Sequence, residues 1–271
     1  MQKQTQMGSF FQFNSGKIHY SDQGKGTVVV LIHGYLETSE VWNSFAQKLA
    51  QNFRIIAIDL PGHGKSDACG EVCTMEFMAT IVKELIRSLN IDLVFLTGHS
   101  IGGYITLAFA DLFPQMLSGF CLFNSHPFAD SVENLEKRKE QINIVKAGNK
   151  NLMVPYIISS LYASVNLQKF SEAVEKSKNI AFSVKGETIT AVLRSMMTRI
   201  SRLSVLEEGK VPCLWVLGTM DNLINYEQIQ TKVRLPANAS MVILKESGHM
   251  GFIEEEDKSV KVITEFVRKW A

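Results

Sequence analysis

Residues 96–109 read LTGHSIGGYITLAF, and this stretch decides the fold that we expect. Ser100 stands between two glycines, with a strand-like apolar run before it (92–98) and a helix-like run behind it (101–113). A serine on so tight a turn has strained backbone angles, and a side chain two positions away would clash with the chain. The turn would hold the Ser100 hydroxyl at the carboxyl edge of a sheet, near the positive end of a helix. The alternative is a serine that only caps the helix.

Strand-like and helix-like runs alternate around this turn. Short, almost wholly apolar runs predict strands buried on both faces at 27–35, 53–64, 92–98 and 117–125. Runs with helical spacing lie between them at 39–50, 74–90 and 101–113. Two short strands at 10–24 predict an opening hairpin. We therefore expect an α/β protein with a mostly parallel sheet flanked by helices.

The pattern changes after the fourth apolar run. From about 126 to 208 the chain reads as successive helices, and strand-like runs return at 211–221 and 239–247 before a closing helix at 254–271. We therefore expect one core domain, built from 1–125 and 208–271, that is interrupted by a helical insertion at 126–207.

A nucleophilic serine needs a base, and the base needs an acid that orients it. In the architecture that holds a serine on such a turn, the acid and then the histidine follow the serine in the chain. Only His126 and His249 follow Ser100, and His126 enters the helical insertion. We predict His249, in the loop KESGHMGF at 245–252, as the base.

The acid must fall between the serine and the histidine. Asp221 directly follows a strand-like run in VLGTMDNLI, at 216–224, and is our predicted acid. Its alternative role is that of a turn aspartate. Asp111 lies inside a helix and Asp130 begins the insertion, while Asn124 carries an amide that cannot act as the acid.

A developing oxyanion needs hydrogen-bond donors. We expect the backbone N–H of Ile101, directly after the serine, and that of Tyr35, in the loop HGY at 33–35, to supply them. His33 precedes Gly34 in that loop, and we expect it to brace the turn.

These motifs together resemble the α/β-hydrolase superfamily. The resemblance rests on HGYLETSEVW (33–42), DLPGHGKSD (59–67), GHSIGGY (98–104), GTMDNLI (218–224) and SGHMGFIEEED (247–257). It implies an eight-stranded, mostly parallel sheet with a helical cap after the sixth strand, and a Ser100–Asp221–His249 triad. Ser100 excludes the branches that use an aspartate nucleophile, and the chain resembles most the capped esterases and carbon–carbon bond hydrolases.

The resemblance implies a serine hydrolase that cleaves an ester or related acyl bond of a small molecule through an acyl-enzyme. Two other functions stay open on the same fold and triad, a small-molecule receptor and a lyase. No metal or organic cofactor is needed, because the triad and the two amides suffice. The sequence identifies neither the natural substrate nor the oligomeric state.

The insertion is expected to cover the site. Its apolar and aromatic residues are candidates to line a substrate pocket: Phe128, Met153, Tyr156, Ile157, Leu161 and Tyr162.

The charge pattern of the sequence argues against several other classes of partner. The net charge of +1 argues against a nucleic acid or an anionic membrane as partner. The one dense charge run, at 136–140, mixes both signs and predicts a solvated helix face. Lys65-Ser66 imitates a phosphate-binding loop only superficially.

The four cysteines are expected to be free thiols. Cys121 and Cys213 lie in apolar runs, and Cys69 and Cys73 lie in a loop, where a disulfide is the alternative. The first residues show no signal-peptide pattern and no apolar run is long enough to span a membrane, so we expect a cytoplasmic protein.

Overall fold

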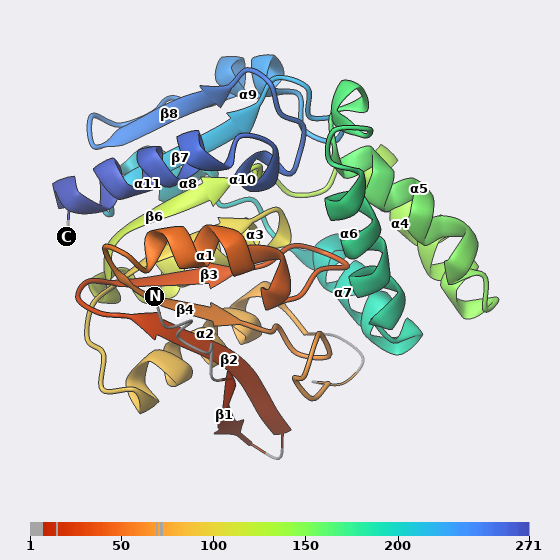
Figure 1. Cartoon of the computed structure of the whole chain (residues 1–271), viewed down its shortest axis with the longest axis horizontal. Helices are drawn as coiled ribbons and strands as arrows, with labels where there is room; N and C mark the ends of the chain where they lie inside the picture. The colour runs from red at the N-terminus through yellow and green to blue at the C-terminus, as the bar shows by residue number, and fades with distance from the viewer. Residues whose placement is uncertain (1–7, 15, 69, 71–72, 271) are drawn as a thin grey trace.

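The computed structural model describes residues 8–14, 16–68, 70 and 73–270. These residues form an eight-stranded sheet in the order β1-β2-β4-β3-β5-β6-β7-β8 (Figure 1). The strands are β1 (Gly8–Phe13), β2 (Gly16–Gly24), β3 (Val28–Ile32), β4 (Arg54–Ile58), β5 (Val94–His99), β6 (Leu117–Phe123), β7 (Cys213–Gly218) and β8 (Ala239–Leu244). Strand β2 pairs antiparallel with β1 and β4, and all the other neighbours are parallel. The predicted eight-stranded, mostly parallel sheet is confirmed.

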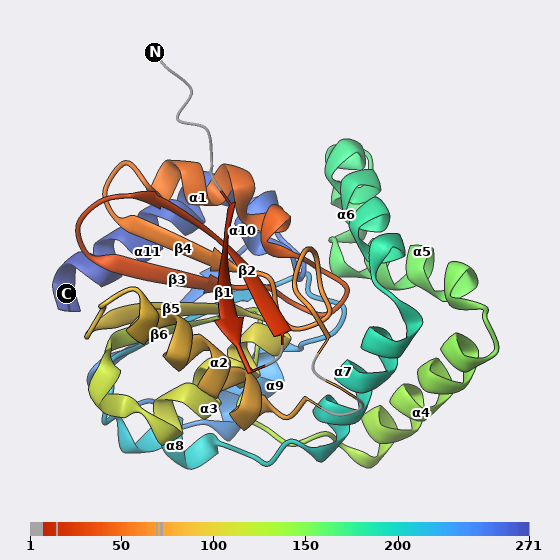
Figure 2. The ribbon, with the colours of Figure 1, turned by 90° about the horizontal axis from the view of Figure 1, so that it is seen from below.

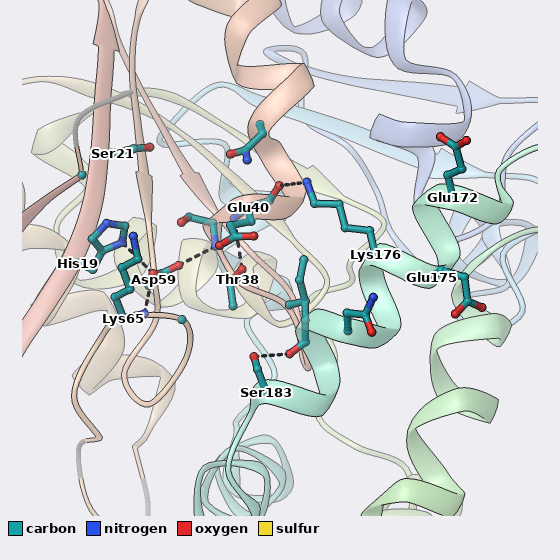
Figure 3. Close-up of a pocket in the computed structure, with 16 residues that line it drawn as sticks. His19, Ser21, Thr38, Glu40, Asp59, Lys65, Glu172, Glu175, Lys176 and Ser183 are labelled. Carbon is teal, nitrogen blue, oxygen red and sulfur yellow. Dashed lines mark hydrogen bonds and ion pairs between the residues drawn. The ribbon is translucent and has the colours of Figure 1, made fainter. Parts of the chain in front are cut away.

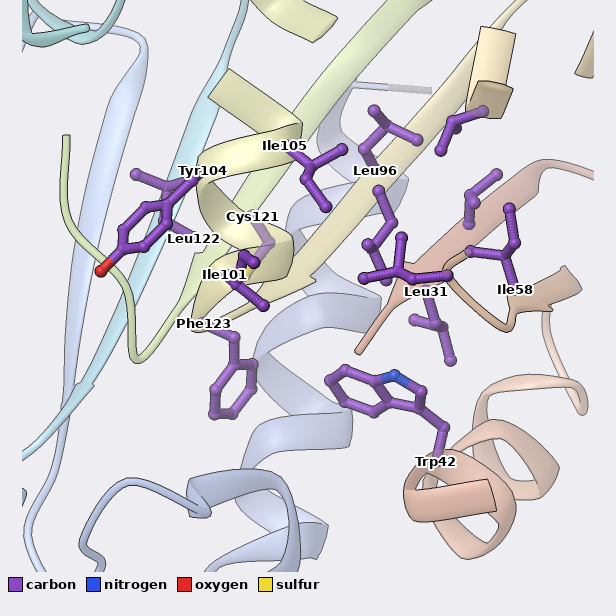
Figure 4. Packing of buried hydrophobic residues seen from close by; sticks show 14 of the residues in the cluster. Leu31, Trp42, Ile58, Leu96, Ile101, Tyr104, Ile105, Cys121, Leu122 and Phe123 are labelled. Atoms are coloured by element: carbon purple, nitrogen blue, oxygen red, sulfur yellow. The ribbon is translucent and has the colours of Figure 1, made fainter. Parts of the chain in front are cut away.

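Helices cover both faces of the sheet. Figure 2 shows α1 (Asn43–Leu49) and α11 (Glu256–Trp270) on one face, and α2 (Met75–Ser88), α3 (Ile101–Leu112) and α8 (Leu203–Glu208) on the other. Each residue of β3 and β5 is buried, as their apolar composition predicted for central strands. Figure 4 shows Ile101 and Ile105 of α3 on one side of the sheet and Trp42 on the other. The nucleophile turn is therefore embedded in the centre of the core.

The segment between β6 and β7 is helical. It contains α4 (Val132–Lys146), α5 (Lys150–Leu161), α6 (Ser171–Ser183) and α7 (Gly186–Thr198), followed by α8. In Figures 1 and 2, α4 to α7 lie together beyond the carboxyl ends of the central strands. The remaining helices are α9 (Tyr226–Lys232), the short α10 (Gly251–Glu254) and three 3₁₀ turns, η1 (Ser39–Trp42), η2 (Pro114–Met116) and η3 (Ser164–Asn166). We call 126–207 the insertion below.

One sequence prediction about the cysteines needs correction. Cys73 is disulfide-bonded, so it is not the free thiol that we expected, and Cys69 lies outside the described residues. Cys121 and Cys213 are free and buried, and burial raises the pKa of both thiols. Among the residues described, no helix combines the length and the apolar character that a membrane crossing requires.

The role of Thr74 at the N-terminus of α2 can be tested by mutation. The Thr74 hydroxyl accepts a hydrogen bond from the Phe77 N–H, as an N-cap residue does. We expect Thr74→Ala to lower the free energy of unfolding by about 1 kcal/mol. Chemical denaturation with circular dichroism measures this difference. Thr74→Ser keeps the accepting oxygen and is the control, so an equal loss in both variants would contradict a capping role.

Candidate active site

Ser100 is held in a strained backbone conformation between β5 and α3. Its φ of 52° and ψ of −116° lie in a region that residues with side chains rarely adopt. The Ser100 N–H donates to the Phe123 carbonyl (3.0 Å), and its carbonyl accepts from the Ser125 hydroxyl (2.7 Å). These contacts fix the turn from the neighbouring strand β6. Ser100 keeps solvent exposure although the residues on both sides are buried.

The neighbouring glycines are required by close backbone approach. A Cβ on Gly98 would lie 2.1 Å from the Gly102 carbonyl oxygen. A Cβ on Gly102 would lie 2.3 Å from the Ile32 carbonyl oxygen of β3. The spacing of glycines around Ser100 therefore follows from packing of the turn against itself and against the adjacent strand.

His249 and Asp221 are brought together at the carboxyl ends of β7 and β8. His249 Nδ1 lies 2.7 Å from Asp221 Oδ2, and both side chains are almost fully buried. The second oxygen, Asp221 Oδ1, accepts from the backbone N–H groups of Leu223 (2.8 Å) and Ile224 (3.0 Å). Asn124 Nδ2 donates to Asp221 Oδ2 (2.9 Å). Asn124, whose amide cannot act as the acid, therefore helps to hold the Asp221 carboxylate in place.

The electrostatics of this pair favour an ionised Asp221 and make His249 a stronger base. Burial raises the pKa of Asp221, but the charge and hydrogen bond of His249 outweigh burial and lower that pKa overall. Burial lowers the pKa of His249, but the Asp221 carboxylate raises it above its ordinary value. When the His249 ring is neutral, its Nδ1–H donates a hydrogen bond to the ionised Asp221. The lone pair of the ring is then on Nε2. Nε2 is buried and has no hydrogen-bond partner within the described chain.

The backbone of His249 is anchored on both sides. Its N–H donates to the carbonyl of Leu161 in the insertion (2.8 Å), and its carbonyl accepts from His99 Nε2 (2.9 Å). Since His99 directly precedes Ser100, this bond places the His249 loop beside the nucleophile turn. The two imidazole centroids are 4.8 Å apart.

Two buried carboxylates hold this arrangement, and the sequence analysis missed both. Glu37 Oε2 accepts the Gly34 N–H (2.6 Å) and contacts His99 Nδ1 (3.1 Å). Burial raises the pKa of Glu37, but His99 and the Gly34 N–H outweigh burial and lower it overall.

Glu254 joins the His249 loop to the insertion. Its Oε2 accepts the Gly248 N–H (2.8 Å), and its Oε1 accepts from the Ala163 N–H (2.9 Å) and from Asn166 Nδ2 (2.8 Å). One carboxylate therefore ties the residue before His249 to the segment that follows α5.

The register of the sheet brings the two predicted oxyanion donors near each other. Ile32 of β3 is paired with Gly98 of β5, and each donor residue lies three positions further on, at Tyr35 and Ile101. Gly34 is fixed by Glu37, and Ile101 is the first residue of α3. The positions suit the expectation for both amides.

The other candidate histidines have different surroundings. His33 Nδ1 contacts the Gly34 carbonyl (2.8 Å), and its Nε2 accepts the Leu60 N–H (3.0 Å), so it braces the turn. His126 Nδ1 accepts the Phe128 N–H (3.2 Å), while its Nε2 contacts the Tyr104 hydroxyl (3.1 Å). Burial, aided by Arg199, lowers the pKa of His126 to about 3.

The structure departs from two expectations for the insertion, at Tyr156 and at Arg138, and the other candidate lining residues stay predictions. Tyr156 is 78% exposed and lines no buried pocket, while Tyr162 is fully buried and bonded to the Ser177 hydroxyl (2.9 Å). Met153 and Leu161 are buried, and Phe128 and Ile157 are half-buried. The charge run at 136–140 is not wholly a solvated face, because Arg138 turns inward to Asp130.

Figure 3 shows a pocket of about 810 Å³ that Ser100 does not line. It is bordered by β2, the loop after β4, η1 and α6, and most of the residues that line it have polar side chains. His19 and Asp59 form a buried contact in its wall (2.8 Å). None of Ser100, Asp221 and His249 lines it, so its size does not mark the candidate active site. Within the described ranges, no group of acids, histidines and cysteines could hold a metal ion.

Comparison with known proteins agrees with this architecture. A sequence profile described as the alpha/beta hydrolase fold matches residues 27–256. The chain therefore belongs to the α/β-hydrolase family. It is 25% identical over 260 residues to the pimeloyl-[acyl-carrier protein] methyl ester esterase of Wigglesworthia glossinidia brevipalpis, covering 91% of this chain and 96% of that one.

Solved structures give the same result. A thermophilic esterase from Thermogutta terrifontis superposes with a TM-score of 0.91 at 25% identity, covering 97% of this chain and 98% of that one. The esterase EaEST from Exiguobacterium antarcticum superposes with a TM-score of 0.87 at 22% identity, with 97% and 100% covered, and shows the shared fold. The family and these relatives support hydrolase activity.

The histidine environments predict distinct titrations. We expect the pKa of His249 to lie above 6.5, because Asp221 outweighs burial. In Asp221→Asn the charge is removed and burial remains, so the pKa of His249 should fall below that value. Histidine NMR across pH 5–8 measures this shift, and His126, with a pKa of about 3, should not titrate in that range. An unchanged His249 titration in the variant would contradict the assigned pair.

Proposed function

We propose that this chain is a serine hydrolase that cleaves an ester or related acyl bond of a small molecule. The observation that carries the proposal is the His249–Asp221 contact, with an unpartnered Nε2, beside the strained turn of Ser100. The esterase activity named for the Wigglesworthia relative supports ester bonds as the substrate class.

The proposed first step is acylation of Ser100. His249 Nε2 takes the hydroxyl proton while Oγ attacks the substrate carbonyl carbon, and Asp221 stabilises the resulting imidazolium. The N–H groups of Ile101 and Tyr35 donate to the oxyanion of the tetrahedral intermediate. The intermediate collapses as His249 returns the proton to the leaving alcohol.

The proposed second step is deacylation. His249 takes a proton from water as the water attacks the acyl carbon, and it returns that proton to Ser100 Oγ when the bond between Oγ and the acyl carbon breaks and the carboxylic acid is released. The reaction needs no group beyond those of the chain and water. The insertion acts in this proposal as a cap, because its Leu161 carbonyl fixes the backbone of the base.

The test is turnover of 4-nitrophenyl esters from acetate to decanoate. We expect multiple turnovers, and we expect Ser100→Ala or His249→Ala to lower kcat by on the order of 10⁴- to 10⁶-fold. Ser183→Ala removes a hydroxyl from the large separate pocket and is the control, with activity close to that of the unaltered protein. The chain-length optimum reports the size of the acyl site.

Two results would overturn this proposal. Turnover that survives in Ser100→Ala would exclude Ser100 as the nucleophile. A single burst that stalls would indicate slow or single-turnover chemistry, as in a receptor, instead of an esterase.

A further inference from the structure

Two arginines of the insertion converge on one carboxylate. Arg138 of α4 contacts Asp130 through Nε (2.5 Å to Oδ2) and Nη2 (3.1 Å to Oδ1). Arg199, directly after α7, contacts the same Asp130 through Nη1 (2.7 Å to Oδ1). The exposed fractions of these side chains are 17% for Arg138, 2% for Arg199 and 1% for Asp130.

The charges of this cluster do not balance. In the part of the chain that the structure describes, neither guanidinium forms an ion pair with a second carboxylate. His126 adds no negative charge, and it stays neutral because burial lowers its pKa to about 3. Two cations therefore share one anion, which leaves one excess positive charge in a largely buried place. Such a charge is costly unless a partner compensates it.

The cluster adjoins the Ser100 turn. Tyr104 lies one helical turn after Ser100 on α3, and the Arg199 guanidinium carbon is 4.1 Å from the centre of its ring. On the other side, the Arg138 charge acts on the Tyr35 hydroxyl, since it counters part of the rise that burial causes in the pKa of Tyr35. Tyr35 is also the residue whose amide is the proposed oxyanion donor. The excess charge thus lies between elements that flank the reacting serine.

Two donors in this region lack a protein partner. Arg199 Nη2 and the Tyr35 hydroxyl are buried, and neither has a hydrogen-bond partner among the described residues. The rest of Arg199 is well satisfied, with Nε bonded to the Phe128 carbonyl (3.2 Å) and Nη1 also bonded to the Met196 carbonyl (2.8 Å). Structural bonds therefore account for Nε and Nη1 of this guanidinium, and the buried Nη2 is left without a partner among the described residues.

We infer that Arg138 and Arg199 form a subsite for an anion, and that the ester substrate carries a carboxylate in addition to the bond that is cleaved. This inference rests on the proposed hydrolase function. A carboxylate oxygen would accept from the guanidinium donors and compensate the excess charge. Asp130 holds both arginines in place, because it contacts each of them. Its negative charge offsets one of the two positive charges, so the subsite keeps one net positive charge.

The test compares two matched pairs of esters. Mono-4-nitrophenyl glutarate and 4-nitrophenyl pentanoate differ by a carboxylate on the acyl side, and 4-acetoxybenzoate and its methyl ester differ by one on the leaving-group side. We expect the charged member of at least one pair to have the higher kcat/KM, by roughly 10- to 100-fold, as for a hydrogen bond to a charged group. Spontaneous hydrolysis of each ester corrects for its own reactivity.

Variants of Arg138 assign the preference to the subsite. Arg138→Met should lower kcat/KM of the charged ester far more than that of the neutral ester, so that the preference is lost, and Arg138→Lys should retain part of it. Lys137→Met removes an exposed cation from the same helix, paired with Glu133, and should leave the preference unchanged. Thermal unfolding of each variant checks that the fold is intact.

A binding measurement separates the two proposals. Glutarate should bind to the Ser100→Ala protein in calorimetry, and Arg138→Met in that background should weaken binding by about tenfold or more. If esters are hydrolysed with no charge preference in either pair, the subsite is excluded and the hydrolase stands. If Ser100→Ala leaves turnover intact but Arg138→Met weakens glutarate binding, the subsite stands and the nucleophile is wrong. An equal loss of preference in Lys137→Met and Arg138→Met would show that the preference for charged esters comes from general surface charge and would overturn the subsite.

Discussion

The close packing of the Ser100 turn against β3 and β6 is the constraint on which the rest of the site depends. A residue with φ of 52° and ψ of −116° is stable only where its surroundings over-determine it. Gly98 and Gly102 supply the missing side-chain volume, and the bond to the Phe123 carbonyl supplies an anchor. Because the central strands are buried on both faces, the strain is balanced by the core and not by the loops around the site.

The candidate base is fixed mainly through its backbone. His249 has one backbone bond to the insertion, through the Leu161 carbonyl, and one to the core, through His99. Glu254 also links the His249 loop to the insertion. Its carboxylate accepts the N–H of Gly248, the residue before His249, and that of Ala163 in the segment after α5. The insertion therefore helps to position the backbone of the candidate base. A displacement of its residues near 161–166 would also displace the imidazole.

The sequence predicted the strands, the tight turn at Ser100 and the pairing of Asp221 with His249, because each leaves a local signal. Buried strands require continuous apolar runs, and the turn requires its glycines. It did not predict Glu37 or Glu254, since each acts through backbone groups that only the folded chain brings near. The disulfide of Cys73 was missed because a loop cysteine carries no such signal.

Arg138 shows why a charge run does not determine its own exposure. Its neighbours within 136–140 are exposed as their composition predicts, but Arg138 faces the core side of α4. Asp130, eight residues earlier, and Arg199, directly after α7, give it an ionic environment that the run itself does not contain. Burial of an arginine is set by its partners and not by the polarity of adjacent residues. Since the partners present supply one negative charge for two positive ones, the surplus is a property of the folded insertion, and it lies beside Tyr104, one helical turn after Ser100.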